Sequence, residues 1–398
     1  MSVGASLLLY CQHSLGIGHL TRSFAIADAL TADFRVVFLN GGPLPSGTRV
    51  PAGVEIVSLP PLGMDEGHGL VSRGTLPLAE AKRRRGQAVL GVLRALRPAV
   101  LLVELFPFGR KKFAFELLPL LKAARRMAPR APVVVCSLRD ILVGGRADQD
   151  HYDERARWIT DRYFDLVLVH ADPAFARLEE SFRPRRPLRT PVRYTGFVVP
   201  ERDAVEAPRR GSYVLVSAGG GAVGRPLFAA ALEAQALLAS RPRRTMRLIA
   251  GPLLPEAEWQ ALRDASVGRG GVDLRRSVPD MGAELRSAGL SVSQCGYNTA
   301  LAIARSGAPA LVVPYGDGGE DEQMNRARRL ENLGVVRVLA PSELTGARLA
   351  AEIVALAEFR PRPAALDCGG AGHTAAILTE MLRARGPVAL GAGVGRPA

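Results

Sequence analysis

The first 200 residues alternate short apolar runs with segments in which apolar positions recur every three or four residues. Short apolar runs bounded by turn residues predict strands, and the wider spacing predicts helices with one buried face. The predicted strands are 7–11, 35–39, 54–59, 100–105, 132–137 and 166–170, and the predicted helices are 21–30, 87–96 and 113–127. Strands that alternate with helices are typical of a parallel sheet covered on both faces.

The same pattern starts again after a polar segment, 201–210, which contains Pro208 and has the composition of a linker. Strands are predicted at 213–217, 246–251, 290–293 and 311–314, and helices at 226–238 and 299–306. We therefore predict an α/β protein with two Rossmann-like domains, 1–200 and 201–385, facing each other across a cleft. Residues 386–398, rich in Gly, Ala and Pro, predict a disordered tail. Ligands of open α/β sheets bind outside the carboxyl ends of the strands, so we expect the chemistry at strand-to-helix turns.

The formal net charge is +14, and arginine clusters lie at 82–85, 110–112, 183–189 and 241–244. Such clusters favour phosphorylated substrates, nucleic acid or an anionic membrane, and solvated surface arginines are the alternative. Aromatic residues make up only 6% of the chain and no nucleic-acid motif accompanies the arginines, so we expect no binding of nucleic acid. Peripheral contact with an anionic membrane stays open.

The sequence predicts a cytoplasmic protein, with any membrane contact at the inner face. No apolar run reaches the roughly 18 residues of a membrane span, and the apolar start of the chain lacks the basic segment and cleavage site of a signal peptide. The cysteines are too far apart for a metal site, and they suit reduced thiols in the cytoplasm: Cys11, Cys136, Cys295 and Cys368.

The turn after the first predicted strand contains Gly16, Gly18, His19 and Arg22. Glycines let the backbone approach a ligand, and the next helix offers unpaired N–H groups. A dinucleotide fingerprint would need a third glycine and a downstream acid, which are missing here. His19 can take a proton from an attacking hydroxyl, or it can merely cap the helix or pack. Arg22 is too basic for that role and is expected to steer phosphate, whereas Glu104, at a strand end, is the second candidate base.

Two turns in the second half suit a diphosphate. The glycines 219–221 follow a strand and precede a helix, so their backbone amides can cradle phosphate, although a tight flexible turn is the alternative. The segment 294–299 joins another strand to a helix, and its Asn298 and Thr299 supply donors at the helix start.

A later loop supplies four acidic or amide side chains: Glu320, Asp321, Glu322 and Gln323. They can bind sugar hydroxyls as donors and acceptors, unless the loop is simply solvated. Asp148 and Asp150 have the spacing of metal-binding acids in some transferases, but they lie in a polar stretch of the other half, and we predict no metal site.

These residues resemble a known donor-binding signature. Segments 294–302, 307–309, 313–314 and 322–323 resemble that of GT-B glycosyltransferases, and most of all the C-terminal domain of glycosyltransferase family 28. This group includes the enzyme that adds N-acetylglucosamine to form lipid II. Segments 14–30, 106–110 and 138–141 are similar to a related bacterial family of predicted glycosyltransferases.

The resemblance implies a GT-B fold and transfer of a sugar from a nucleotide-diphosphate sugar to an acceptor hydroxyl, with inversion and without a metal or a further cofactor. It also implies residue roles. His19 would lie near the acceptor, Val278 at the nucleobase, and Glu322 with Gln323 at the donor sugar. The diphosphate would contact Gly219, Gly220, Gly221, Cys295, Gly296, Asn298 and Thr299.

The chain departs from this signature at two positions. Gln294 stands where the family often has His or Arg, and Ala302 stands where it usually has a Glu that binds both ribose hydroxyls. Either Glu320 or Asp321 replaces that acid, or the donor ribose lacks a 2′-hydroxyl, as in a dTDP-sugar.

Two alternatives remain at the level of sequence. A nucleotide-sugar 2-epimerase shares the architecture but would need several acids in the cleft. A non-catalytic nucleotide-binding scaffold would explain Ala302 as lost donor affinity.

Overall fold

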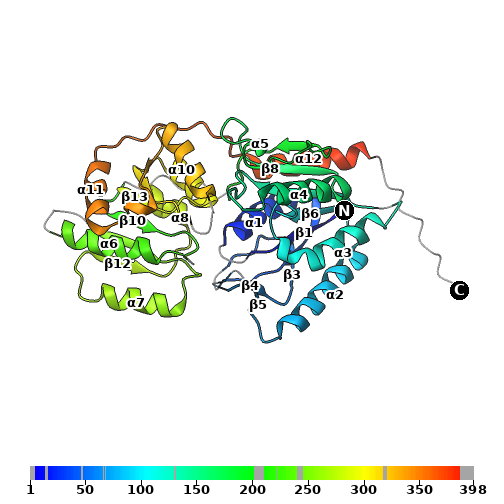
Figure 1. Cartoon of the computed structure of the whole chain (residues 1–398), viewed down its shortest axis with the longest axis horizontal. Coiled ribbons are helices and arrows are strands. Elements are labelled where there is room, and N and C mark those ends of the chain that lie inside the picture. Colours follow the sequence, from blue (N-terminus) through cyan, green and yellow to red (C-terminus); the bar gives the residue numbers. More distant parts are fainter. Residues whose placement is uncertain are drawn as a thin grey trace.

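The computed structural model describes residues 5–13, 17–45, 48–65, 67, 69–129, 131–200, 210–221, 223–239, 245–316 and 321–385. Two parallel sheets, one in each half of the sequence, form two lobes that lie side by side (Figure 1). The two predicted Rossmann-like α/β domains are both present. The predicted linker falls almost wholly in 201–209, outside the described residues, as does the predicted tail.

The N-terminal sheet has seven parallel strands in the order β3-β2-β1-β6-β7-β8-β9. These strands are β1 (Ala5–Cys11), β2 (Phe34–Asn40), β3 (Val54–Ser58), β6 (Val100–Glu104), β7 (Val133–Arg139), β8 (Leu166–His170) and β9 (Val192–Tyr194). The order reverses between β1 and β6, where Tyr10 lies beside Val103. Cys11 and Glu104 therefore end at the same rim, at the point where ligands of open α/β sheets bind.

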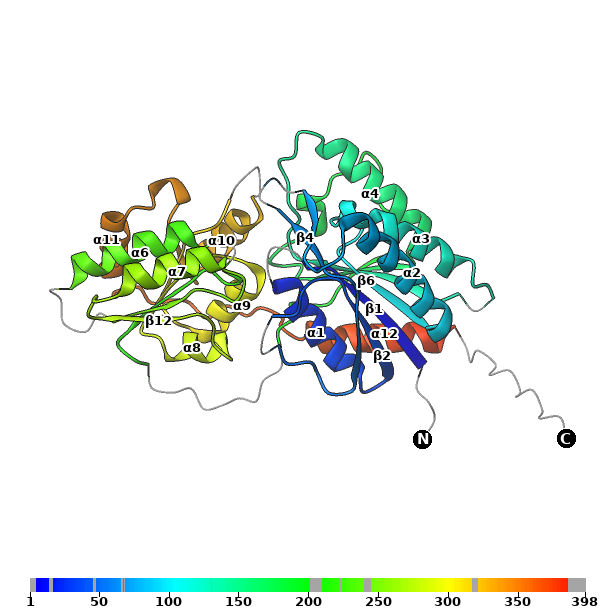
Figure 2. The same ribbon diagram turned by 90° about the horizontal axis from the view of Figure 1, so that it is seen from below.

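Helices cover both faces of this sheet (Figure 2). On one face lie α2 (Leu78–Leu96), α3 (Ala114–Arg125) and α4 (Gln149–Tyr163), and on the other lie α1 (Gly18–Leu30) and α12 (Gly370–Ala384). Shorter elements are the hairpin β4 (Leu62–Met64) and β5 (Leu70–Ser72), the 3-10 turn η1 (Lys111–Phe113) and α5 (Leu178–Ser181). The inner strands β1, β6, β7 and β8 are almost continuously apolar because both of their faces are buried, whereas the edge strands β3 and β9 are partly exposed.

The second sheet has six parallel strands in the order β12-β11-β10-β13-β14-β15. These are β10 (Val214–Ser217), β11 (Met246–Ile249), β12 (Val272–Arg275), β13 (Leu290–Ser293), β14 (Ala310–Val312) and β15 (Arg337–Val338). One face packs on α6 (Arg225–Leu238), α7 (Glu256–Ser266) and α11 (Gly346–Leu356). The other packs on α8 (Met281–Ser287), α9 (Tyr297–Ser306) and α10 (Glu322–Asn332); the 3-10 turn η2 (Pro341–Glu343) precedes α11.

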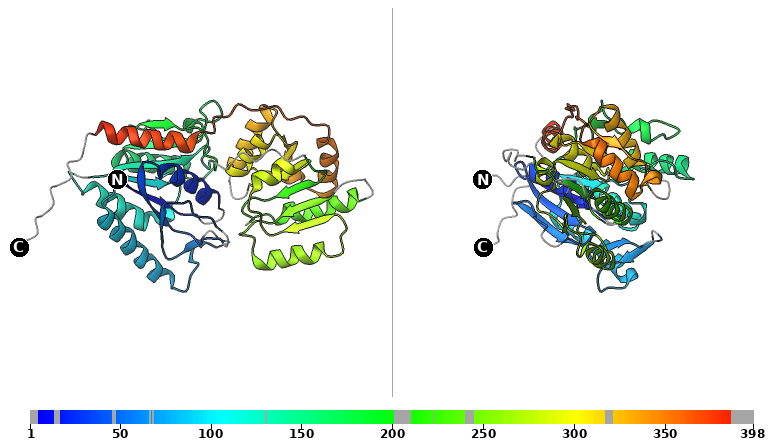
Figure 3. Two further views of the ribbon diagram at one scale, coloured as in Figure 1. Left: turned by 180° about the vertical axis from the view of Figure 1, so that it is seen from behind. Right: turned by 90° about the vertical axis from the view of Figure 1, so that its left-hand side faces the viewer.

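The last helix, α12, crosses back and packs on the N-terminal lobe (Figure 3). Its Ala371, Ala375 and Leu378 are buried in the same cluster as Phe24 and Ala27 of α1. The predicted second domain, 201–385, therefore includes a helix that belongs by packing to the first. Amphipathic spacing indicates that a helix has a buried face, but it does not say which sheet that face covers.

A continuous apolar cluster joins the two lobes. It includes buried residues of the N-terminal sheet and of α9 and α10. Within it, the ring centroid of Phe197 lies 5.4 Å from that of Phe175 and 5.8 Å from that of Tyr297. Among the residues that the structure describes, no helix combines the length and apolar composition that a membrane crossing needs.

The arginine cluster at 82–85 divides into surface and core. Arg83 and Arg84 are exposed and paired with Glu80, but Arg85 is fully buried. Its guanidinium donates to both carboxylate oxygens of Glu116, at 2.5 and 2.9 Å, and to the backbone carbonyl of Gly41 at 2.7 Å. Arg85 thus cannot contribute to the basic surface that the sequence suggested.

We predict that Arg85→Ala destabilises the protein far more than Arg83→Ala. Removing Arg85 leaves the Glu116 carboxylate buried without its cation, at a cost of about 3–5 kcal/mol, whereas an exposed pair contributes at most about 1 kcal/mol. Urea unfolding of both variants measures the difference. Equal losses of stability would contradict the role of the buried pair.

Candidate active site

His19 and Glu104 meet at the point where the N-terminal strand order reverses. His19 lies in the first turn of α1, directly after the β1 loop, and Glu104 is the last residue of β6. The His19 Nδ1 atom lies 2.5 Å from Glu104 Oε1. An ionised carboxylate only accepts hydrogen bonds, so this contact places the imidazole proton on Nδ1 and leaves Nε2 able to accept one. The two residues that the sequence offered as rival bases therefore form one pair.

Cations keep the Glu104 carboxylate ionised. Arg22 Nη2 lies 2.5 Å from Glu104 Oε1, and Arg110 Nε lies 4.0 Å from Oε2. Burial by itself raises the pKa of Glu104, but His19, Arg22 and Arg110 overcome this effect and lower it to about 2. Glu104 is thus a permanent anion that orients His19.

Burial lowers the pKa of His19 to about 3, with Glu104 opposing the shift. From sequence alone, the expected pKa of His19 is the ordinary value near 6.5. With a pKa of about 3, His19 stays neutral at physiological pH. Its side chain is 17% exposed, so the imidazole is not fully closed off from solvent.

Arg22 does not lie free in the cleft as the sequence suggested. It is 1% exposed, bonded to Glu104, and its guanidinium carbon lies 5.2 Å from the ring centroid of Tyr297 in the other lobe. The Arg22 guanidinium is therefore paired with buried groups of the protein, and we no longer expect it to steer phosphate. Gly18 contacts the second lobe through its carbonyl, whereas Gly16 lies outside the described residues.

The N-terminus of α9 faces this rim from the second lobe. Gly296 precedes its first turn, and a Cβ built on Gly296 would meet no described atom within 4 Å. The first N–H groups of a helix have no partner within it and carry partial positive charge, so this open end suits an anion. The Asn298 Nδ2 donates to the carbonyl of Gly18 at 3.1 Å, and its Oδ1 is buried without a partner among the described residues.

The glycine turn after β10 lies beside the same helix. Gly219 has a φ of +61°, and a Cβ there would come within 3.3 Å of Thr299 Oγ1, so the two predicted phosphate turns converge. Gly221 has a φ of +90°, and its Cβ would collide with the carbonyl of Ala250 at 2.2 Å. Gly221 is thus required by backbone packing, and Gly220 pairs with the same neighbouring loop by accepting from the Leu253 N–H. Their phosphate contacts stay predictions.

Cys295 lies in the turn that is predicted to bind phosphate, and two residues of α10 hold its backbone. Its thiol is fully buried, which raises its pKa to about 12. Its N–H donates to Gln323 Oε1 at 3.0 Å, and its carbonyl accepts from Arg326 Nη1 at 2.8 Å. Both backbone groups are engaged by α10, so in this arrangement Cys295 is not available to bind phosphate as predicted.

The predicted sugar-binding residues of α10 also have protein partners. Glu322 pairs with Arg139 of β7, and Gln323 accepts from the N–H groups of Cys295 and Tyr315. Asp321 accepts from the Gly144 N–H at 3.0 Å. A donor sugar would have to displace Arg139 from Glu322 or use its remaining lone pairs.

The positions predicted to face the nucleobase and the ribose both pack against the apolar cluster that joins the lobes. Val278, in the loop after β12, and Ala302, one turn beyond Asn298 on α9, are both half-buried against it. The two acids proposed to replace the missing Glu do not settle the question, because Asp321 is engaged as above and Glu320 lies outside the described residues. Gln294 is buried and donates to the carbonyl of Val223.

Sequence reasoning missed three residues that join the lobes. Tyr297 donates to the carbonyl of His170 at 3.0 Å and accepts from the Val198 N–H at 2.9 Å. Asp140 and Arg326 form a bidentate buried ion pair between the lobes. The segment 138–141 gave a signal through its family resemblance, but no local pattern indicates a partner nearly two hundred residues away.

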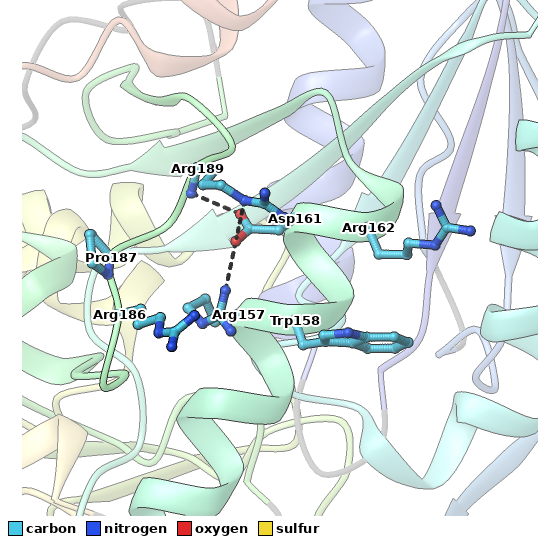
Figure 4. A pocket seen from close by; sticks show the side chains of 7 residues that line it. All are labelled: Arg157, Trp158, Asp161, Arg162, Arg186, Pro187 and Arg189. Carbon is cyan, nitrogen blue, oxygen red and sulfur yellow. Dashed lines mark hydrogen bonds and ion pairs between the residues drawn. The ribbon is translucent and has the colours of Figure 1, made fainter.

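A separate cavity of about 540 Å³ lies at α4 and the segment before β9 (Figure 4). Its lining includes Trp158 and four arginines, and Arg157 and the backbone of Arg189 bond to Asp161. None of the predicted site residues lines it. Within the described ranges no three His, Cys, Asp or Glu residues are grouped so that they could hold a metal ion, and Asp148 and Asp150 lie at the start of α4.

The comparison with known proteins agrees with this arrangement. The model of the glycosyltransferase family 28 C-terminal domain matches residues 216–373. A UDP-N-acetylglucosamine–N-acetylmuramyl-(pentapeptide) pyrophosphoryl-undecaprenol N-acetylglucosamine transferase of Verminephrobacter eiseniae is 30% identical over 369 residues, which cover 88% of this chain and 89% of the relative. The chain belongs to glycosyltransferase family 28. A second relative of this family 28 protein, a transferase of the same name from Methylorubrum extorquens, is 29% identical over 95% of both chains.

Solved structures share the fold of this glycosyltransferase. MurG of Acinetobacter baumannii has a TM-score of 0.57 at 15% identity, covering 94% of this chain and 100% of that one. A calicheamicin glycosyltransferase has a TM-score of 0.55 at 16% identity, covering 96% and 95%. Both confirm the two-lobed GT-B architecture.

Buried histidines should make the stability of this family 28 protein fall in mild acid. Burial lowers the pKa of His13 to about 4, and those of His19 and His170 to about 3. Unfolded imidazoles titrate near 6.5, so between about pH 6.5 and about pH 4 the unfolded chain binds more protons, and each buried histidine costs about 1 kcal/mol of stability per pH unit.

Urea unfolding between about pH 7 and about pH 5 measures this slope. His170→Asn should reduce it by one histidine's share, whereas His151→Asn, at an exposed position, should leave it unchanged. A stability that does not change over this range would show that the three imidazoles are not held neutral.

Proposed function

We propose that this glycosyltransferase moves a sugar from a UDP-sugar to an acceptor hydroxyl, with His19 as the base. The observation that carries the proposal is the His19–Glu104 pair, which faces the open N-terminus of α9 across the junction of the two lobes. The carboxylate holds the Nδ1 proton, so Nε2 is free to take the proton of the attacking hydroxyl.

The leaving diphosphate would gain charge as the sugar departs. The first N–H groups of α9 and the turn at Gly219 would stabilise that charge without moving. The base and the diphosphate site belong to opposite lobes, so an acceptor activated by His19 attacks the sugar from the side away from the phosphate. A single displacement of this kind inverts the anomeric carbon. Helix dipoles and fixed donors supply the charge stabilisation, which supports a reaction that needs no metal.

The donor is proposed from the relatives. Their names specify UDP-N-acetylglucosamine, which makes it the first donor to test. Ala302 offers no acceptor to the ribose, so we propose that this chain discriminates little between ribose and deoxyribose donors.

The acceptor and its location are also proposed from the relatives, whose names specify a lipid-linked acceptor, a pyrophosphoryl-undecaprenol. A lipid-linked acceptor would bring the N-terminal lobe to the inner face of a membrane. Exposed Arg83, Arg84, Lys111 and Lys112 remain available for contact with anionic lipid, whereas Arg85 and Arg110 do not.

The epimerase alternative is not favoured, because the matching family and the curated relatives are transferases. A putative epimerase shares the fold at 15% identity, which carries no information about activity. The same relatives argue against a non-catalytic scaffold.

We predict that His19→Ala lowers kcat by about 10²–10⁴ while changing donor affinity little, because the diphosphate binds to the other lobe. The assay is slow donor hydrolysis without acceptor, using the nucleotide sugar that most stabilises the protein against heat. Glu104→Gln keeps the shape but loses the charge that orients His19, and it should also lower kcat. His151→Ala is the matched control. A His19→Ala variant that loses donor affinity but keeps kcat would make His19 a binding residue.

The pH profile tests the same pair independently. A neutral His19 is the active form, and its pKa of about 3 places the loss of activity on acidification well below the ordinary value near 6.5. The kcat should therefore be flat from about pH 8 to about pH 5. A decline centred near pH 6.5 would contradict the depressed pKa.

We predict that Ala302→Glu creates selectivity for ribose. In the unaltered protein UDP and dTDP should bind within about tenfold of each other, because no carboxylate accepts the 2′-hydroxyl. The substitution should tighten UDP relative to dTDP, measured by calorimetry. A natural protein that already prefers UDP by far more than tenfold would show that another residue binds the hydroxyl.

A further inference from the structure

Two residues at the end of β7 bind α10 across the lobe junction with crossed charges. Arg139, the last residue of β7, pairs with Glu322, and Asp140, the next residue, pairs with Arg326. Glu322 and Arg326 are four positions apart, so they lie on one face of α10. The N-terminal lobe therefore binds the start of α10 through ion pairs at two successive helical turns.

The second pair is the more strongly built. Asp140 Oδ2 and Oδ1 accept from Arg326 Nε at 2.7 Å and Nη2 at 2.8 Å, and both side chains are almost fully buried, at 0% and 2% exposed. Burial raises the pKa of the Asp140 carboxyl, but Arg326 outweighs burial and holds the pKa below its usual value. A bidentate pair of this geometry fixes the guanidinium plane as well as its position.

The third nitrogen of Arg326 reaches the phosphate turn. Nη1 donates to the carbonyl of Cys295 at 2.8 Å, while Gln323 of the same helix accepts from the Cys295 N–H at 3.0 Å. Both backbone groups of Cys295 are thus fixed by α10. The next residue, Gly296, is the N-cap of α9, and the N–H groups that follow it form the open end of this helix.

We propose that Asp140 is a positioning residue for the donor diphosphate, acting through Arg326 on the Cys295 peptide. This inference rests on the proposed function. The acceptor lobe orients the guanidinium, the guanidinium fixes the carbonyl of Cys295, and the carbonyl fixes the direction of the N–H groups that follow. The donor site is complete only when the two lobes are in contact.

The test compares nucleotides that share a base but differ in phosphate. Asp140→Asn retains the shape of the side chain but loses its charge, so Arg326 is held less firmly. UDP affinity should fall by about tenfold, as for a weakened charge-assisted contact, whereas uridine affinity, measured by competition, should change by less than about twofold. Arg326→Lys keeps a cation but lacks the fork that reaches both Asp140 and Cys295, and it should show the same selective loss.

Arg329→Ala is the matched control. Arg329 also lies on α10 and crosses the junction, bonding to Glu180 at 2.7 Å and to the Phe175 carbonyl at 2.6 Å, but it does not touch the phosphate turn. Its loss should leave the ratio of UDP to uridine affinity unchanged.

The possible results distinguish the positioning role of Asp140 from the proposed function. If Asp140→Asn and Arg326→Lys fold and retain the natural ratio of UDP to uridine affinity, the positioning role is wrong. The same holds if Arg329→Ala shifts the ratio equally, because any loosened junction would then suffice. A natural protein that binds neither UDP nor dTDP would instead overturn the proposed function. Should Asp140→Asn fail to fold, Arg326→Lys carries the same comparison.

Discussion

The first turn of α9 is held against the N-terminal lobe, and the candidate site depends on this contact. Tyr297 bridges the His170 carbonyl and the Val198 N–H, and Asn298 reaches the carbonyl of Gly18. Buried polar groups need hydrogen-bond partners, so separating the lobes would leave several of these groups without one. The contact brings the open helix end of one lobe to the base of the other. Neither lobe contains the whole site.

Glu104 plays the corresponding part within the N-terminal lobe. One of its oxygens receives His19 and Arg22 at 2.5 Å each, and its charge is maintained despite complete burial. A buried carboxylate is tolerated only with such partners. The same burial that makes the anion costly keeps His19 neutral, and a neutral imidazole with an oriented Nδ1 proton is what a general base requires. The burial of Glu104 and His19 therefore explains both the ion pairing of the site and its proposed chemistry.

The two sheets could be predicted from sequence because their central strands are short apolar runs and the glycine turns follow two of them. The edge strands β9, β12 and β15 were not predicted, because they are short, contain charged residues and are only partly buried. His19, Glu104 and the turns at Gly219 and Gly296 could be found for the same reason, since parallel strands end at one rim. The interior charges could not be predicted, because Arg85 and Arg110 look like the surface arginines beside them. The packing of α12 on the first lobe and the partner of Asp140 also escaped, because they depend on contacts between residues far apart in the chain. Cys295 was predicted to contact phosphate, but its backbone N–H and carbonyl bond to side chains of α10. The sequence does not show the direction of backbone groups or which distant side chains contact them.

The most direct test of the assembled site is a crystal structure of the protein with UDP. We expect the diphosphate to lie against the first N–H groups of α9, beside Gly219, with its distal phosphate facing His19 Nε2 across the lobe junction. We also expect the Glu104 carboxylate to keep its contact with His19 Nδ1. A diphosphate bound elsewhere, such as among the arginines of the cavity at α4, with α9 unoccupied, would contradict the proposed site.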